Sequence, residues 1–124
     1  VQMAKNWGAD VFVSIHMNKF PQTQYSGLQV YYSPNDPGSV QMADMIQSYV
    51  QKYVQPENER KTKKATKGIY LLHRMEIPAV LVECGFLSNE EEAALLSDAS
   101  YRKTLSLGIA CAIMEYCTKD PADG

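Results

Sequence analysis

The chain has 124 residues, of which 45% are hydrophobic and 21% charged, and its formal net charge at pH 7 is -2. This length favours a single globular domain, and so small a net charge gives none of the basic field with which proteins attract nucleic acid. The longest apolar stretch, residues 77–82, is far shorter than the roughly 20 residues of a membrane-spanning helix. We therefore expect one domain, no nucleic-acid partner and no membrane span.

The first half of the chain alternates between helix and strand signals. Residues 1–7 are typical of the last turns of a helix, and Gly8 can end it because glycine accepts a left-handed conformation. Residues 11–16 and 28–32 are rich in β-branched and apolar side chains, as strands are. Apolar residues spaced three and four apart predict an amphipathic helix over residues 40–54.

The middle of the chain is predicted to contain a loop and two more strands. Residues 57–67 are polar and basic, which predicts a surface loop. Residues 69–72 and 79–82 are short apolar runs, which we interpret as strands.

Two helices are predicted to close the chain. Ser88 or Asn89 can cap a helix that begins at Glu90, with a glutamate three residues on to complete a capping box. An apolar stripe predicts a last helix over residues 101–116, and residues 118–124 are expected to be a disordered tail. Strands that alternate with amphipathic helices predict a three-layer α/β fold, in which a mostly parallel sheet lies between helices.

The three cysteines, Cys84, Cys111 and Cys117, cannot all pair with one another. The last two lie six residues apart on a predicted helix, which is too far for an unstrained disulfide. We interpret all three as thiols that are buried and unreactive.

His16 and Glu83 each follow an apolar strand directly. Because side chains alternate along a strand, His16 shares a face with Ser14, and Glu83 shares one with Leu81. In open α/β sheets the crevice beyond the carboxyl ends of the strands holds ligands and catalytic groups. Each residue also has a structural interpretation, His16 as a hydrogen-bonding residue and Glu83 as an acceptor for N–H groups of the following turn. Cys84 points to the opposite face from Glu83, so a Cys84–His16 nucleophilic pair has poor geometry.

Two longer segments surround these residues. Residues 9–18 read ADVFVSIHMN, and residues 77–92 read IPAVLVECGFLSNEEE. Both resemble motifs of the zinc-dependent N-acetylmuramoyl-L-alanine amidases, which are bacterial cell-wall hydrolases, and the second follows the family pattern almost residue for residue. Residues 26–33 and 68–72 are similar to the intervening strands of that family. The resemblance covers the chain up to about Tyr116 and is strongest for the spore-cortex, germination-specific type.

This resemblance implies a reaction and a set of site residues. In the family a zinc ion is held by a His, a Glu and a second His, and the bond that is cut joins the lactyl group of N-acetylmuramic acid to L-alanine. The resemblance implies that His16 is the last of these ligands and that Glu83 is the catalytic glutamate, which does not bind the metal. It places Asn18, His73 and Arg74 in substrate binding. Zn2+ is the implied cofactor, and peptidoglycan is the implied substrate.

The other His and Glu ligands of the family precede the part that this chain matches. We therefore expect residues 1–124 to be the C-terminal portion of a single catalytic domain that lacks its first strands and is inactive alone. Its sheet would then have an exposed edge through which the chain could self-associate. The implied location is extracytoplasmic, at the cell envelope or spore cortex, with an export signal that this chain does not contain.

Alternatives remain open for the whole chain and for one of its segments. The chain could be a catalytically silent peptidoglycan-binding or regulatory module of the same fold, although the presence of both His16 and Glu83 favours an enzyme. The basic run from Arg60 to Lys67 is typical of a solvated loop, but it could also lie against anionic wall polymers.

Overall fold

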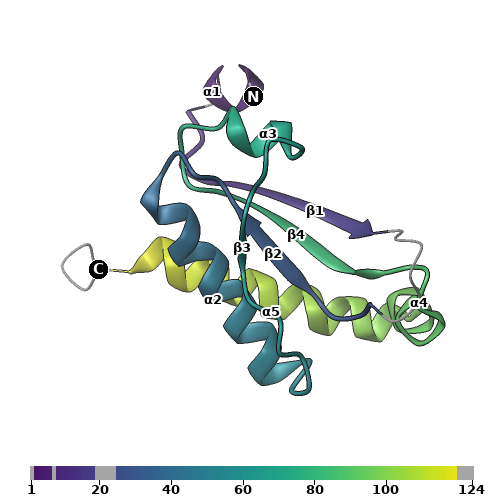
Figure 1. Ribbon diagram of the computed structural model, residues 1–124. Helices are drawn as coiled ribbons and strands as arrows, with labels where there is room; N and C mark the ends of the chain where they lie inside the picture. Colours follow the sequence, from purple (N-terminus) through teal and green to yellow (C-terminus); the bar gives the residue numbers. More distant parts are fainter. Residues whose placement is uncertain (1, 7, 19–24, 120–124) are drawn as a thin grey trace.

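The computed structural model describes residues 2–6, 8–18 and 25–119 of the chain (Figure 1). None of the helices in this part has the length and apolarity that crossing a membrane requires. In chain order, the helices and strands are α1 (Gln2–Asn6), β1 (Phe12–Asn18), β2 (Gln29–Tyr32), α2 (Pro37–Tyr53), β3 (Lys63–Lys64), α3 (Tyr70–His73), β4 (Ala79–Phe86), α4 (Glu90–Ser97) and α5 (Ala99–Thr118).

The strands form one sheet in the order β1-β4-β2-β3. The central strand β4 pairs parallel with β1 and antiparallel with β2, and β2 pairs parallel with β3. A strand with a neighbour on each side and packing on both faces is expected to be apolar throughout. Accordingly, every residue of β4 except Glu83 is buried. The predictions of an α/β fold and a mostly parallel sheet are confirmed.

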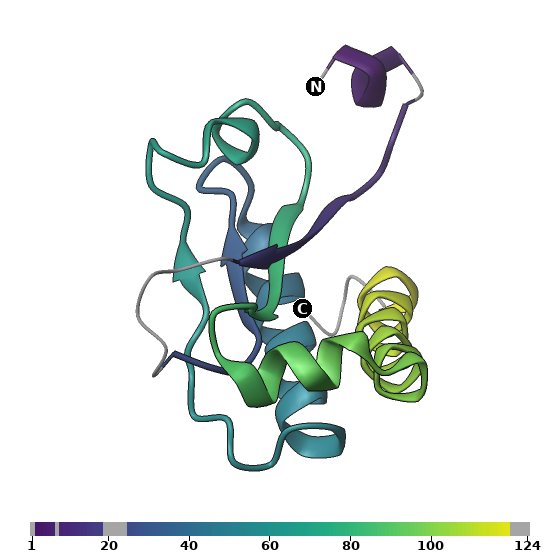
Figure 2. The same ribbon diagram turned by 90° about the vertical axis from the view of Figure 1, so that its right-hand side faces the viewer.

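Helices α2 and α5 cover one face of the sheet (Figures 1 and 2). The core between the helices and the sheet is made of buried side chains from both: Leu28, Val30, Met42, Ile46, Val50, Val80, Val82, Leu105 and Ile109. The opposite face carries a smaller cluster beneath the short helix α3: Ala65, Leu72, Met75, Ala79 and Leu81. Helix α3 precedes β4, so among the described residues it covers this face near the amino end of that strand (Figure 1).

The starts of two helices are set by capping residues. Helix α2 begins earlier than predicted because Asp36 is its N-cap and accepts from Gly38 N at 2.7 Å, while Pro37 occupies a position where its missing N–H costs nothing. Helix α4 begins where predicted, since the Asn89 side chain accepts from Glu92 N at 3.1 Å.

The predicted strand over residues 69–72 is wrong, because most of this segment forms helix α3. In a strand, Tyr70 and Leu72 would point to the same face, but Tyr70 is 65% exposed and Leu72 is fully buried. Leu72 is instead buried together with Met75, three residues on, which is a helical spacing. A run of four apolar residues has no period that could distinguish the two structures.

The predicted surface loop over residues 57–67 contains the short strand β3. Lys63 and Lys64 are exposed, yet their backbones pair with Tyr31 and Tyr32 of β2. Polar composition did not exclude this pairing, because an edge strand needs backbone hydrogen bonds and can leave its side chains in solvent.

The cysteine and tail predictions hold in part. All three cysteines are free, but only Cys84 is buried, and Cys111 and Cys117 are exposed. The burial prediction is wrong for these two because they lie outside the buried stripe of α5. Helix α5 continues through Thr118, so that residue is helical, and residues 120–124 of the expected tail lie outside the described residues.

Candidate active site

His16 and Glu83 lie side by side in the sheet. They are partners in the parallel register of β1 and β4, and neighbouring strands are about 4.8 Å apart. Glu83 continues the alternation of Ala79 and Leu81, which point away from α2 and α5. Both polar residues are therefore on the face that the large helices leave uncovered.

The Glu83 carboxylate has an unusual environment. Burial raises its pKa above the ordinary value of 4.5, although the nearby His16 acts in the opposite direction. Its Oε2 is buried and has no hydrogen-bond partner among the described residues. If Glu83 had a purely structural role, N–H groups of the following turn were expected to donate to its carboxylate. The Phe86 amide donates to Glu92 at 2.7 Å instead. This oxygen is therefore available to a proton or a ligand.

The His16 ring is fixed by its neighbour on the same face. Its Nε2 is 2.8 Å from Ser14 Oγ, with the donor set by the ring tautomer. A histidine that binds a metal through one ring nitrogen usually uses the other in such a hydrogen bond. The residues that the structure describes contain no group of three or more His, Cys, Asp or Glu side chains able to hold a metal ion. They therefore fit one ligand and a neighbouring acid of a zinc site, and not the complete ligand set.

The sequence interpretation missed the residues on the other side of Glu83. Gln29 is the partner of Glu83 in the antiparallel pairing of β2 and β4. Arg60 Nη1 donates to Gln29 Oε1 at 3.0 Å, and Gln29 Nε2 donates to Lys61 O at 2.7 Å. Burial and the Glu83 charge raise the pKa of Tyr31, while the Arg60 charge lowers it. A glutamine within an apolar strand was the one signal in the sequence that could have indicated this side of the site.

The model of a protein family described as N-acetylmuramoyl-L-alanine amidase matches residues 1–115 of the chain. The chain belongs to this amidase family.

Individual amidases are similar over nearly all of the chain. The germination-specific N-acetylmuramoyl-L-alanine amidase of Bacillus subtilis (strain 168) is 32% identical over 127 residues, which cover 99% of this chain and 52% of that protein. The amidase AmiA of Escherichia coli (strain K12) is 24% identical over 158 residues, covering 94% of this chain and 55% of that protein. The solved CwlD amidase of Clostridioides difficile, in complex with the GerS lipoprotein, has a TM-score of 0.90 at 39% identity and covers 96% of this chain and 60% of that one. The chain thus spans about half the length of these curated relatives.

The residues expected to bind substrate are not all near Glu83. His73 and Arg74 lie in and just after α3, which precedes the amino end of β4, whereas Glu83 is near its carboxyl end (Figure 1). The His73 ring is 2.9 Å from Ala65 O through Nε2. Asn18 ends β1, and its side chain lies outside what the structure describes. The substrate-binding role of these residues stays a prediction.

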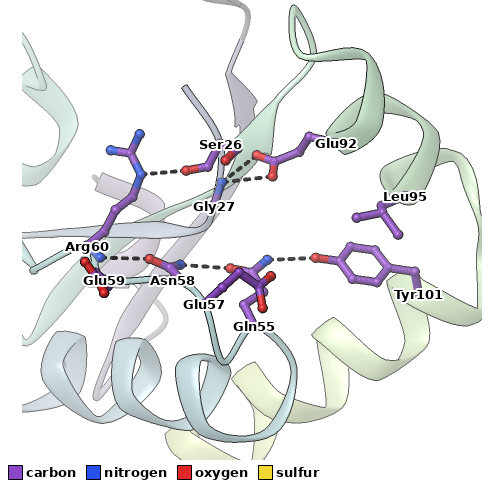
Figure 3. A pocket seen from close by; sticks show the side chains of 10 residues that line it. All are labelled: Ser26, Gly27, Gln55, Glu57, Asn58, Glu59, Arg60, Glu92, Leu95 and Tyr101. Carbon is purple, nitrogen blue, oxygen red and sulfur yellow. Dashed lines mark hydrogen bonds between the residues drawn. The ribbon is translucent and has the colours of Figure 1, made fainter. Parts of the chain in front are cut away.

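In this amidase family member, Glu92 joins three parts of the chain beside the site (Figure 3). Its carboxylate accepts from Gly27 N through both oxygens, at 2.9 and 2.8 Å, and from Phe86 N. It therefore holds α4, the end of β4 and the segment before β2 together. The predicted capping box is therefore right in one part and wrong in the other. Asn89 is the N-cap, as predicted, but the Glu92 carboxylate accepts from Gly27 N and Phe86 N.

Proposed function

We propose that this chain contributes His16 and Glu83 to the active site of a zinc-dependent N-acetylmuramoyl-L-alanine amidase. The reaction is hydrolysis of the amide bond between N-acetylmuramic acid and L-alanine in peptidoglycan, in remodelling of the cell wall or spore cortex. The observation that carries the proposal is the buried Glu83 Oε2, which has no described partner and lies beside His16. A buried carboxylate oxygen without a hydrogen bond costs stability, and a catalytic function explains why such a group is kept.

Glu83 is the proton carrier in this proposal. Its Oε2 takes a proton from the attacking water and passes it to the departing amine of L-alanine. Burial raises the pKa of the carboxyl, which makes it a better base for the first step. His16 would be a zinc ligand, with its ring oriented by Ser14 Oγ, which lies 2.8 Å from its Nε2. The zinc ion would supply a Lewis acid that polarises the amide carbonyl and makes the water more acidic.

We also propose that the 124-residue chain does not hydrolyse peptidoglycan by itself. A catalytic zinc site usually has three protein ligands, and the described residues supply one of them in His16. The other two would come from elsewhere in the family's fold. β1 is at the edge of the described sheet, so self-association through its free backbone groups is a further part of the proposal.

The remaining assignments follow from the family. We propose Asn18, His73 and Arg74 as substrate-binding residues, and an extracytoplasmic location at the cell envelope or spore cortex. The curated relatives include a germination-specific amidase and probable cell wall amidases, which supports this location.

A chimera tests the proposed function. The chain would be joined behind the portion of the Bacillus subtilis germination-specific amidase that it does not match, and incubated with zinc and purified peptidoglycan. Mass spectrometry should detect newly freed L-alanine amino termini with the chimera, and none with its Glu83→Gln or His16→Ala variants. The chain alone should release none.

Each outcome separates two alternatives. Release by the Glu83→Gln chimera at the unaltered rate would exclude Glu83 as the proton carrier. A folded chimera that binds peptidoglycan and releases nothing would favour the catalytically silent binding module. Release by the chain alone, abolished by Glu83→Gln, would support the chemistry and contradict the proposed inactivity of the chain.

A further inference from the structure

Arg60 lies on the opposite side of Glu83 from His16. Gln29 and Glu83 are directly opposed across β2 and β4, so their side chains share a face with Cβ atoms about 5 Å apart. Arg60 Nη1 donates to Gln29 Oε1 at 3.0 Å. The three side chains therefore form a row that leads from the guanidinium to the carboxylate.

The guanidinium is held in place before any ligand arrives. Its Nε donates to Ser26 O at 2.8 Å, and its Cζ lies 4.8 Å from the centre of the Phe86 ring and 5.8 Å from that of Tyr25. Figure 3 shows the side chain extending toward Ser26. An arginine already stacked and hydrogen-bonded loses little further freedom when it binds a ligand.

The backbone of Arg60 is fixed as well, within the segment predicted as a solvated loop. Its N–H donates to Asn58 Oδ1 at 2.8 Å, and its carbonyl accepts from Gln51 Nε2 at 2.6 Å. Asn58 in turn donates to Gln55 Oε1 at 2.8 Å (Figure 3) and to Leu28 O at 3.0 Å. Side-chain amides thus attach this segment to β2 and α2, which sets Arg60 apart from the exposed lysines that follow it.

Arg60 has no ion-pair partner among the described residues, although Glu57, Glu59 and Glu92 line the same pocket. Within residues 2–6, 8–18 and 25–119, its polar contacts are to the neutral Ser26 carbonyl and Gln29 amide oxygens, and no carboxylate forms an ion pair with it. Arg60 is a partly buried residue, and the planar fork of a guanidinium matches a carboxylate or phosphate. The missing counter-ion indicates that a ligand supplies it.

We propose that Arg60 binds a carboxylate of the peptide part of the substrate, on the L-alanine side of the bond that is cut. This proposal rests on the proposed amidase function. The lactyl carboxyl is consumed in the scissile amide, so the peptide is the part of the substrate that carries free carboxylates. A carboxylate on the residue after L-alanine lies about 7 Å from that amide in an extended chain, a span that fits the row from Glu83 through Gln29 to Arg60.

Two ligands test the proposal with the chain as it exists. One is N-acetylmuramoyl-L-alanyl-D-glutamate, with two free carboxylates, and the other is its bis-amide, with none. In NMR titrations the wild-type chain should bind the diacid roughly tenfold more tightly than the bis-amide. Arg60→Gln should abolish the difference, and Arg60→Lys should retain part of it, because lysine keeps the charge without the planar fork. Lys64→Gln, which removes an exposed charge on β3, is the matched control and should keep the full preference.

A second measurement protects the test against a variant that fails to fold. In the wild-type chain, the Arg60 Nε–H resonance should shift on addition of the diacid and remain in place with the bis-amide. A purely structural arginine would show neither this shift nor the ligand preference.

The failures can be told apart. If the Arg60→Gln chain still preferred the diacid to the bis-amide, the proposal would be overturned. It would also be overturned if Lys64→Gln reduced this preference as much as Arg60→Gln does, because the basic segment would then attract anions in general. Equal binding of both ligands would overturn the role of Arg60 and leave the amidase function intact. Binding of neither ligand would count against the proposed substrate and against Arg60 together.

Discussion

The carboxylates of Glu83 and Glu92 stand near the end of the same strand and have opposite hydrogen bonding. Glu92 accepts from the Gly27 and Phe86 amides at 2.7 to 2.9 Å, whereas the buried Oε2 of Glu83 accepts from none of the described residues. Glu92 is therefore held by backbone donors, whereas burial raises the pKa of the Glu83 carboxyl above its ordinary value. The two glutamates should therefore respond differently when each is replaced by glutamine.

Glu92→Gln should destabilise the chain. The side chain is 7% exposed, and an amide in its place would set an NH2 donor against the Gly27 N–H where Glu92 Oε2 now accepts at 2.8 Å. Losing this charged acceptor in a buried position costs about 1–3 kcal/mol, so the free energy of unfolding in urea should fall by about that amount. Glu91→Gln, at an exposed position in the same helical turn, is the control and should change little. Equal stability of the two variants would contradict a structural role for Glu92.

Gly85→Ala should destabilise the chain through the same carboxylate. A Cβ at this position would overlap the Glu92 side chain, so either the strand or the carboxylate must shift. Overpacking of this kind costs about 1–3 kcal/mol. The melting temperature measured by circular dichroism should fall.

Gly108→Ala provides the comparison. Its Cβ would meet Val54 Cγ2 at 3.5 Å, an ordinary contact, and alanine favours the α5 helix over glycine by about 1 kcal/mol. This variant should melt at the same temperature or higher. A Gly85→Ala variant as stable as Gly108→Ala would show that the Glu92 carboxylate is not confined.

The pairing of His16 with Glu83 could be predicted from the sequence because it depends on local rules. Alternation along each strand gives the face, and two parallel strands that end at one edge bring the residues together. The position of Arg60 could not be predicted in this way. It depends on the antiparallel pairing of β2 with β4 and on amide contacts between segments far apart in the chain.

Two other segments show the same limit of local reasoning. Residues 69–72 are too few to show a period, so burial of Leu72 with Met75 decided for helix. Glu92 occupies the expected position of a capping-box glutamate, but Gly27 is 65 residues away and gives no signal near it. In both cases the local sequence is compatible with more than one structure, and a tertiary contact decides between them.

The three thiols should differ in reactivity. Cys84 is buried, and burial with the charges of Glu83 and Glu92 raises its pKa to about 11, whereas Cys111 and Cys117 are exposed. Because the thiolate is the reactive form, iodoacetamide should label Cys111 and Cys117 in the folded chain and Cys84 only after unfolding. Mass spectrometry of the labelled peptides reads this directly, with Cys84→Ala as the control that should leave native labelling unchanged. Rapid native labelling of Cys84 would contradict its burial against the helices.

The stability of the chain should depend on pH through Glu83. Its pKa in the folded chain is raised above 4.5, so the folded state favours the protonated carboxyl. Stability from this group is fully present below its pKa in the unfolded chain, and it is lost as pH rises through the pKa in the folded chain. Glu83→Gln, which cannot ionise, should therefore gain in stability relative to the wild type as pH increases from about 4 toward 7.

Urea unfolding of both proteins across this range measures the difference, and Glu90→Gln, at an exposed carboxylate, should not show it. A constant difference between Glu83→Gln and the wild type across this range would mean that the carboxyl titrates alike in both states, and the case for Glu83 as a tuned base would then be lost.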